Sequence, residues 1–347
     1  MSRSKILTFS LIGNIILKDI LRRIFMKSFE IKKNDADQRL DKFVTKTVPN
    51  LPKALLYKYI RTKRIKVNSK RAEISTRLRE GDVVDMYIND EFFVKSETRY
   101  DFSGASDKLD ILYEDENIML LDKKAGLLCH PDDKEYVDTL ISRVKKYLYN
   151  KKEYDPDSEN SFTPALVNRI DRNTGGIVIA AKNAQSLKIL NAQMKERNLK
   201  KTYLCVVHGV MERQSGLLTG WLVKDEDKNK VKIFKNHVPD SKEIKTKYTV
   251  IENDTENNLS LVEVDLLTGR THQIRAHFAS IGHPLLGDGK YGTNALNKKM
   301  GYKKQFLYSY KLRFEMDENA GELAYLNGRT FTAKDVWFER EFKNRNL

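Results

Sequence analysis

Residues 259–278 read LSLVEVDLLTGRTHQIRAHF, and this stretch contains the signals of a strand, a turn and a helix in succession. Its first nine residues are mostly apolar and indicate a short strand. Thr268 and Gly269 then interrupt the pattern, and a helix is expected over 271–281. The strand and helix together predict a packed domain in which the turn between them presents its side chains.

Charged and polar side chains are concentrated in this turn and at the start of the helix. Arg270 and Arg275 offer planar donor groups that match a carboxylate or a phosphate. His272 and Gln273 add donors near a helix N-terminus, which already favours anions. Ordinary helix capping with exposed charge would use the same residues, so the segment by itself does not establish a site.

Outward from this stretch, strands and helices follow one another without a regular alternation. Strands are expected at IVIAAKN (177–183) and TYLCVVHG (202–209), and a helix is expected over 184–197. The irregular order argues against a parallel βαβ sheet. The sequence therefore predicts an α+β domain over 109–347, with a mixed and largely antiparallel sheet.

A second polar cluster, NRIDRNTGG at 168–176, precedes one of these strands. Asp171 lies between Arg169 and Arg172, whose charges would keep the carboxylate ionised. Loops held by a sheet commonly carry reactive side chains, so Asp171 is a candidate nucleophile or base. An aspartate that only hydrogen-bonds the backbone of a tight turn is the alternative.

The part of the chain before this domain has a different pattern. Residues 37–88 predict two short helices followed by a few short strands, and 89–108 predict a linker. The chain holds 63 Lys and Arg against 48 Asp and Glu, a net charge of +15 that favours a polyanionic partner. A basic cluster in the small domain includes Lys58, Arg61, Lys63 and Arg64, although a solvated charged face is the alternative.

Residues 1–25 are interpreted as a disordered or mis-assigned leader before Met26. Their apolar stretch, ILTFSLIGNIIL at 6–17, is shorter than the roughly 20 residues that span a bilayer and lacks a cleavage site. Cys129 and Cys205 form no CxxC pair, and the histidines lack the spacing of zinc ligands. We therefore expect a cytoplasmic protein without a metal site, cofactor or membrane partner.

Three motifs together resemble the RluA-type RNA pseudouridine synthase family. The family signature is an HRLDxxTSG-like loop, a KxYxxxVxG strand and a GRTHQIRxHxxxxGxPLxGDxxYG segment. This chain has NRIDRNTGG, KTYLCVVHG at 201–209 and GRTHQIRAHFASIGHPLLGDGKYG at 269–292. RLDKFV at 39–44 and IRTKRIKVN at 60–68 are similar to the alpha-L RNA-binding module of small-subunit ribosomal protein S-four. The resemblance implies a pseudouridine synthase domain preceded by an RNA-binding module.

The resemblance also implies roles for individual residues. Asp171 would be the catalytic carboxylate, Arg275 its ion-pair partner and Tyr203 the ring that stacks on the target base. Arg169 would fill the gap left by the flipped nucleotide, and Leu307 would line the base pocket where relatives often show LHA. Asn168 and Gly175 depart from the usual histidine and serine, and neither change removes a group that the chemistry requires.

The expected reaction is isomerisation of a uridine, without a redox agent. Asp171 could attack the anomeric carbon or take a proton from the neighbouring sugar carbon, and the sequence does not choose between these routes. Large-subunit ribosomal RNA is the expected partner, transfer RNA is the alternative, and a monomer is expected. A non-catalytic RNA-binding or ribosome-assembly factor would not require Asp171, Tyr203 and Arg275, and no triad or metal spacing supports a small-molecule hydrolase.

Overall fold

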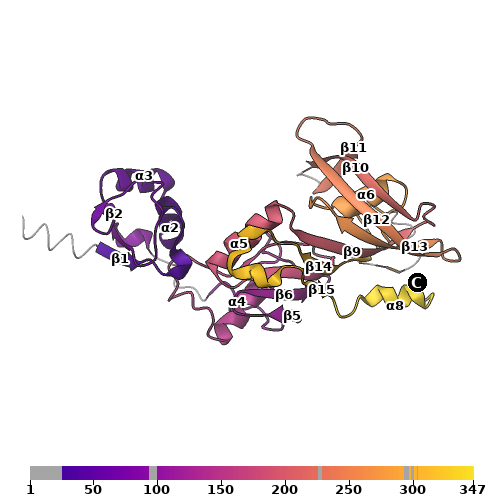
Figure 1. The fold of residues 1–347 in the computed structure, drawn as a ribbon, viewed down its shortest axis with the longest axis horizontal. Helices are drawn as coiled ribbons and strands as arrows, with labels where there is room; N and C mark the ends of the chain where they lie inside the picture. The colour runs from indigo at the N-terminus through magenta and orange to yellow at the C-terminus, as the bar shows by residue number, and fades with distance from the viewer. Residues whose placement is uncertain (1–25, 94–99, 226–228, 293–296, 298–300, 303) are drawn as a thin grey trace, which may run out of the picture. The chain divides into compact units, whose positions relative to one another are not determined.

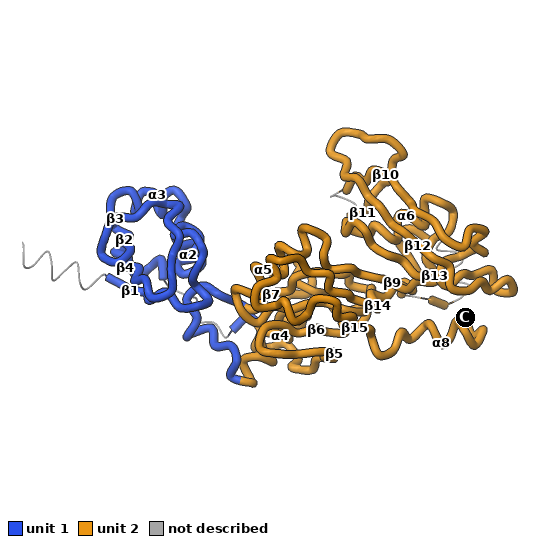
Figure 2. Tube along the Cα trace, viewed as in Figure 1, with its two compact units in different colours: residues 1–101, 152–163 blue, residues 102–151, 164–347 orange. Residues whose placement is uncertain are grey.

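A computed structural model of the chain describes residues 26–93, 100–225, 229–292, 297, 301–302 and 304–347. The predicted leader, residues 1–25, lies outside the described residues. The chain divides into two compact units, which Figure 2 shows in different colours. The first comprises the residues up to Asp101 together with Lys152–Thr163, and the second comprises Phe102–Lys151 and Pro164–Leu347.

The first unit is a small module of helices and a four-stranded antiparallel sheet in the order β1-β4-β2-β3. Phe43, Leu56 and Val84 are among the side chains that form its buried core. The two short helices and the short strands expected from the sequence are confirmed. Their bounds are β1 (Met26–Glu30), α2 (Leu40–Thr47), α3 (Lys53–Arg61), β2 (Ile65–Val67), β3 (Lys70–Arg71) and β4 (Val83–Tyr87).

The boundaries of this unit differ from the predicted 37–88. Residue 26 already begins β1, and Phe93, predicted to lie in the linker, stacks on Phe29 with a centroid distance of 6.1 Å. Residues 152–163 also belong to the first unit, because Asn160 and Ser161 donate to the buried Asp35 carboxylate at 2.8 and 2.6 Å. Local periodicity carries no information about such a return of the chain.

The second unit is built on an eleven-stranded sheet (Figure 1). Its main path is β11-β10-β12-β13-β9-β14-β8-β6-β5, with β7 on β8 and β15 on β14. Every strand pair is antiparallel except β14 with β8, which confirms the predicted α+β class. The strands are β5 (Ile111–Glu114), β6 (Ile118–Lys123), β7 (Ala165–Leu166), β8 (Gly175–Ala181), β9 (Leu199–His208), β10 (Ser215–Asp225), β11 (Lys230–Phe234), β12 (Lys242–Asp254), β13 (Leu259–Leu266), β14 (Leu307–Phe314) and β15 (Thr330–Thr332).

Helices cover parts of this sheet. Ile179 of β8 packs with Leu190 of α5 (Ala184–Lys195) and Leu323 of η3 (Glu318–Leu326) in one apolar cluster. The Asn183 side chain caps α5 by accepting from Ser186 N at 2.8 Å. The helix expected over 271–281 is α6 (Gln273–Ser280), whereas α4 (Leu140–Asn150) and α8 (Trp337–Lys343) had no counterpart among the predicted elements.

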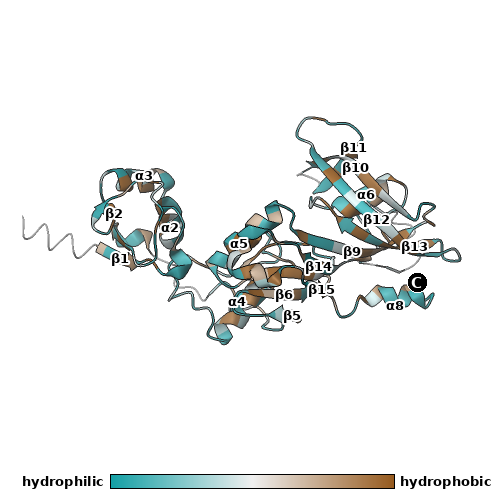
Figure 3. Ribbon diagram, in the orientation of Figure 1, coloured by the Kyte–Doolittle hydropathy of each residue, from teal (hydrophilic) through white to brown (hydrophobic). Residues whose placement is uncertain are grey.

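Apolar side chains concentrate inside the second unit, as the hydropathy colouring of β6 illustrates (Figure 3). Ile118–Leu121 of β6 are all at most 1% exposed. β6 pairs with β8 along its whole length, and every residue of β8 is buried, so the loop that enters β8 has a rigid support. In the described part of the chain, no helix combines the length and the apolar character needed to cross a membrane.

Candidate active site

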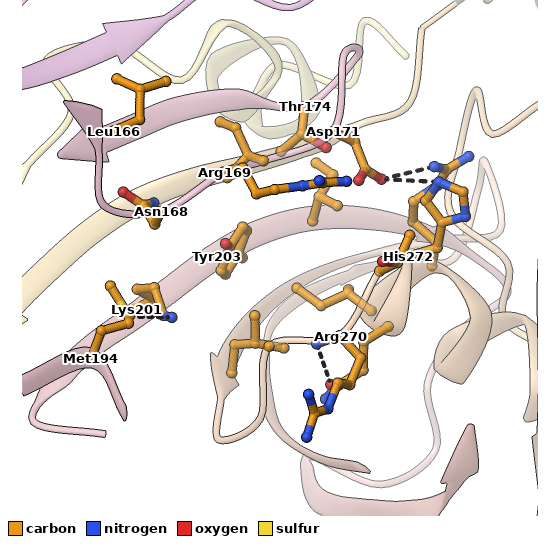
Figure 4. Close-up of a pocket in the computed structure, with 18 of the residues that line it drawn as sticks. Leu166, Asn168, Arg169, Asp171, Thr174, Met194, Lys201, Tyr203, Arg270 and His272 are labelled. Carbon is orange, nitrogen blue, oxygen red and sulfur yellow. Dashed lines mark hydrogen bonds and ion pairs between the residues drawn. The ribbon is translucent and has the colours of Figure 1, made fainter. Parts of the chain in front are cut away.

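A pocket of about 510 Å³ opens in the second unit, between the loop that precedes β8 and the turn that precedes α6. Figure 4 shows Asp171 and Arg169 on the first of these segments and Arg270 and His272 on the second. Tyr203 of β9 lies between them. The structure thus brings the three sequence motifs together, although they are separated by up to about a hundred residues along the chain.

Hydrogen bonds to neighbouring parts of the second unit hold this loop. Asn168 accepts from Ile179 N at 2.8 Å and donates to Ile177 O at 3.3 Å, which ties the loop to β8. The Lys123 ammonium donates to Arg172 O at 3.0 Å, and Gln305 Nε2 donates to Thr174 Oγ1 at 2.6 Å. Asp171 lies between these anchors, with its side chain 27% exposed toward the pocket.

Asp171 is paired with a buried arginine that has a second carboxylate behind it. Arg275 Nη1 donates to Asp171 Oδ2 at 2.8 Å, while its Nε and Nη2 donate to Asp288 at 2.7 and 2.9 Å. Burial disfavours the charge of Arg275, but the bonds to Asp288 and Asp171 outweigh it and raise the pKa. The two hydrogen bonds to Asp288 fix the plane of the guanidinium group, so Nη1 points at Asp171.

His272 approaches Asp171 without adding a charge. Its Nε2 lies 3.8 Å from Asp171 Oδ2, and its Nδ1 shares a hydrogen bond with Tyr291 OH at 2.9 Å. Burial is the main cause that lowers the pKa of His272 to about 4, against the opposing charge of Asp171. The imidazole is therefore neutral at pH 7, and Arg275 is the charged partner of Asp171.

Tyr203 and Leu307 form the apolar part of the pocket. Tyr203 is 6% exposed, and Leu307 of the adjacent β14 is 5% exposed. Burial raises the pKa of the Tyr203 phenol to about 12, so the ring is uncharged at neutral pH. Such a ring offers a flat stacking surface for a base.

The other predicted site residues divide into exposed and internal groups. Arg169 and Arg270 are exposed while lining the pocket. Gln273 is 2% exposed, and its amide bonds internally to Thr268, Arg270 N, Lys245 O and Thr246. Gln273 therefore holds the turn together, which the prediction of an RNA donor did not anticipate.

The predicted basic cluster lies in the first unit. Lys58, Arg61 and Lys63 are exposed, whereas Arg64 stacks on the Tyr59 ring at 4.2 Å and donates from Nε to Tyr87 O at 2.9 Å. The first three side chains therefore keep their charge available, and part of the Arg64 guanidinium is used within the module.

Gly175 is one of the two departures from the usual motif, and the side chain of Tyr308 fills the space beside it. A Cβ atom at residue 175 would lie 2.5 Å from Cε2 of the Tyr308 ring, which is closer than real contacts allow. Tyr308 stands in the segment where relatives often show LHA and donates its hydroxyl proton to Asp122 at 2.6 Å. The Tyr308 ring thus occupies space that the Cβ of a serine would need.

Two supporting residues, Lys123 and Asp288, were not identified as site residues from the sequence. Lys123 is 1% exposed, donates to three backbone carbonyls, and has a pKa lowered to about 8, mainly by burial. A lysine that ends the apolar strand IMLLDK was a usable signal, and Asp288 was visible inside the GDGKYG stretch. Among the residues described, no group of three or more His, Cys, Asp or Glu side chains is arranged to hold a metal ion.

Comparisons with known proteins match two parts of the chain to two known families. Residues 117–280 match the RNA pseudouridylate synthase family, and residues 38–84 match the S4 domain. The chain is 33% identical over 316 residues to an uncharacterized RNA pseudouridine synthase of Mycoplasma genitalium, covering 90% of this chain and 97% of that protein.

A ribosomal large subunit pseudouridine synthase C of Rickettsia bellii is 34% identical to this chain over 289 residues, covering 78% of this chain and 87% of the relative. Among solved structures, human RNA Pseudouridylate Synthase Domain Containing 4 has a similar fold, with a TM-score of 0.52 and 20% identity. The alignment covers 68% of this chain and 92% of the human one.

Proposed function

Because the chain belongs to the RNA pseudouridine synthase family, whose members are isomerases that act on RNA, we propose that Asp171 carries out this reaction on a uridine of large-subunit ribosomal RNA. The observation that supports the role of Asp171 is its 2.8 Å contact with Arg275, which Asp288 holds from behind. An ionised carboxylate fixed at the mouth of a pocket is what the reaction requires.

In this reaction the uracil is detached from its ribose, rotated and rejoined through a carbon atom instead of a nitrogen. Asp171 starts it either by attacking the anomeric carbon or by taking a proton from the neighbouring sugar carbon. Arg275 serves both routes, because its 2.8 Å contact holds the carboxylate oxygen in place. The neutral His272 leaves the negative charge of Asp171 undiminished.

Tyr203 and Leu307 hold the base while it is free to rotate. The flat phenol ring stacks on the uracil, and Leu307 closes the apolar side of the pocket. The nucleotide must leave the RNA stack to reach Asp171, at a cost of a few kcal/mol. Arg169 and Arg270, exposed at the pocket, offset part of that cost by contacting the RNA left behind.

The S4 domain supplies a second RNA-binding surface through the exposed Lys58, Arg61 and Lys63. Large-subunit ribosomal RNA is favoured as substrate because relatives covered over most of their length carry that substrate in their names. A protein that acts on ribosomal RNA would work in the cytoplasm. Transfer RNA is the second candidate, since the site recognises a flipped uridine and not a particular RNA.

Pseudouridine mapping in a strain lacking this gene tests the proposal. We expect one or more pseudouridines to disappear from large-subunit ribosomal RNA and to return when the intact gene is supplied. The Asp171→Asn gene should not restore them. If the protein only binds RNA and another enzyme forms the pseudouridines, the Asp171→Asn gene should restore them as well as the intact gene does. Loss confined to transfer RNA would select the second candidate, and an unchanged map in all RNA would refute both.

A further inference from the structure

A larger groove, of about 1100 Å³, adjoins the candidate active site in the second unit. The pocket and the groove share the lining residues Met194, Lys201, Leu266, Gly269 and Arg270. They meet where the pairing of β9 with β13 ends, since Thr202 and Asp265 are the last partners in register. The groove is therefore a continuation of the pocket past the end of this strand pair.

The groove carries a large excess of positive charge. Nine lysine and arginine side chains line it, against the two carboxylates of Asp265 and Glu315. Glu315 is already paired with Lys200 at 3.5 Å and with Arg313 at 3.2 Å. Lys245 and Lys311 are likewise paired, with Glu243 at 3.0 Å and with Glu263 at 3.4 Å. The other five cations have no ion pair within the described chain, and this excess of positive charge favours an anionic ligand.

Besides Arg270, which also lines the pocket, three of these cations are both exposed and unpaired. Lys195 is the last residue of α5, Arg197 follows that helix, and Lys247 lies on β12. Within the part of the chain that the structure describes, none of the three contacts a carboxylate. Their charges therefore remain available to a ligand.

The cations are spread across the sheet and not gathered around a point. Lys311, Thr202, Asp265 and Lys247 are successive register partners across β14, β9, β13 and β12, so they lie side by side on one face of the sheet. Lys200 and Arg313 form the neighbouring pair. Lys311 and Lys247 thus lie at the two ends of a row four strands wide, with Thr202 and Asp265 between them. Cations spread over such a width fit an extended polyanion better than a small anion.

Lys201 marks the junction between the pocket and the groove, because it lines both. Figure 4 shows it beside Met194 in the lining of the pocket. Its ammonium donates to Met194 Sδ at 3.2 Å, and a thioether is a weak acceptor. Burial lowers the pKa of Lys201, and no carboxylate partner offsets this among the described residues. A phosphate beside Lys201 would supply the missing negative charge.

We propose that this groove binds the sugar-phosphate backbone of the RNA strand that flanks the target uridine, and that Lys201 contacts a phosphate where the strand leaves the pocket. The inference rests on the proposed function, because the pocket must first hold an RNA nucleotide. Direct continuity with that pocket favours the substrate strand over an acidic protein segment, which would have no reason to enter the active site.

The test compares two triple variants of the full chain that remove the same charge. Lys195→Ala/Arg197→Ala/Lys247→Ala strips the groove, and Lys334→Ala/Arg340→Ala/Lys343→Ala strips exposed cations that line neither cavity. A transcript of the organism's own large-subunit ribosomal RNA is the probe. Filter binding at several salt concentrations gives Kd, and tritium release gives KM and kcat.

The groove variant should raise Kd and KM about tenfold and reduce the salt slope of log Kd by about 2, because three phosphate contacts at ~0.7 each are lost. Its kcat should stay within about twofold, and the control should match the wild type in every measurement. Lys201→Met should raise KM more than it lowers kcat, and Lys201→Arg should recover part of the loss.

The outcomes separate the two proposals. If the groove variant behaves like the control, the proposal that the groove binds RNA is wrong, whatever the activity of the wild type. A wild type that binds the transcript with a groove-dependent salt slope but converts no uridine in it contradicts the proposed substrate and leaves the groove standing. If the groove variant binds RNA normally but fails to capture an acidic peptide, the groove serves a protein partner instead and the proposal is wrong.

Discussion

The two segments that face each other across the pocket are held in different ways. In the loop 168–174, anchors from elsewhere fix the backbone, and Asp171 itself remains partly exposed with one charged partner. In the segment 268–278, the side chains of Gln273, Arg275 and His277 are buried. Gln273 and His277 both form hydrogen bonds with Thr246, and Arg275 donates to Asp288. One segment presents the reactive group, and the other is the rigid support against which it is aimed.

This difference implies that activity and stability are separable in the loop but coupled in the support. A change to the exposed carboxylate leaves every buried contact in place. A change to the buried arginine breaks a charge pair that the fold requires, and the catalytic contact with it. Variants on the two sides of the pocket should therefore differ in kind as well as in size.

The largest effect is expected for Asp171→Asn, which keeps the shape of the side chain but removes the ionised oxygen. Pseudouridine formation should fall by about 10⁴-fold or more, as for the loss of a catalytic nucleophile. The melting temperature and RNA affinity should hardly change, because Arg275 keeps both bonds to Asp288. Single-turnover tritium release measures the rate, and the exposed Asp240→Asn is the matched control. Comparable turnover by both variants would remove Asp171 from the mechanism.

The next effect is expected for Arg275→Met, which should damage both activity and folding. Asp288, whose side chain is 0% exposed, would be left as a buried charge without its partner. The free energy of unfolding should fall by about 3–5 kcal/mol, and the rate by about 10²–10³-fold. Urea denaturation and single-turnover kinetics measure the two quantities.

Arg270→Met is the control for this variant, because Arg270 is an exposed arginine of the same segment and lacks an ion pair in the described chain. Its stability should stay within about 0.5 kcal/mol of the wild type. The double variant Arg275→Met/Asp288→Asn removes the stranded charge, so it should regain part of the stability but none of the rate. Recovery of the rate together with stability would show that Arg275 acts only through folding.

A smaller effect is expected where the loop enters β8. Gly175→Ser alone should lower stability by about 1–3 kcal/mol, because its Cβ would collide with the Tyr308 ring. Tyr308→His leaves more room, so the double variant should be more stable than the sum of the two single changes predicts. Urea denaturation of all four proteins gives the coupling energy. Strictly additive changes would mean that Gly175 and Tyr308 are not a matched pair.

The sequence predicted the elements of the site better than the contacts between them. The helices at α5 and α6 and the strands β8, β9 and β13 were expected because their periodicity is local. The placement of residues 152–163 with the first unit was not, since it depends on hydrogen bonds to Asp35 more than 120 residues away. Burial of Gln273 and the second carboxylate behind Arg275 are likewise consequences of tertiary packing.

The smallest of these effects concerns acid stability on the rigid side of the pocket. Burial lowers the pKa of His277 to about 4 from an ordinary value of 6.5, and its Nδ1 shares a hydrogen bond with Thr246 Oγ1 at 2.9 Å. Between these two values the unfolded chain binds a proton that the folded chain does not, so stability falls as the pH drops from 6.5 toward 4. At 1.36 kcal/mol per unit, the contribution between pH 6.5 and 4.5 is on the order of 2 kcal/mol. His277→Leu removes this titration while His272 still titrates in both proteins. Urea denaturation at pH 6.5 and 4.5 should therefore show a loss about 2 kcal/mol smaller for His277→Leu than for the wild type, with the exposed His237→Leu behaving like the wild type. An equal loss in all three proteins would mean that His277 is protonated without cost and that this side of the pocket is less rigid than its contacts indicate.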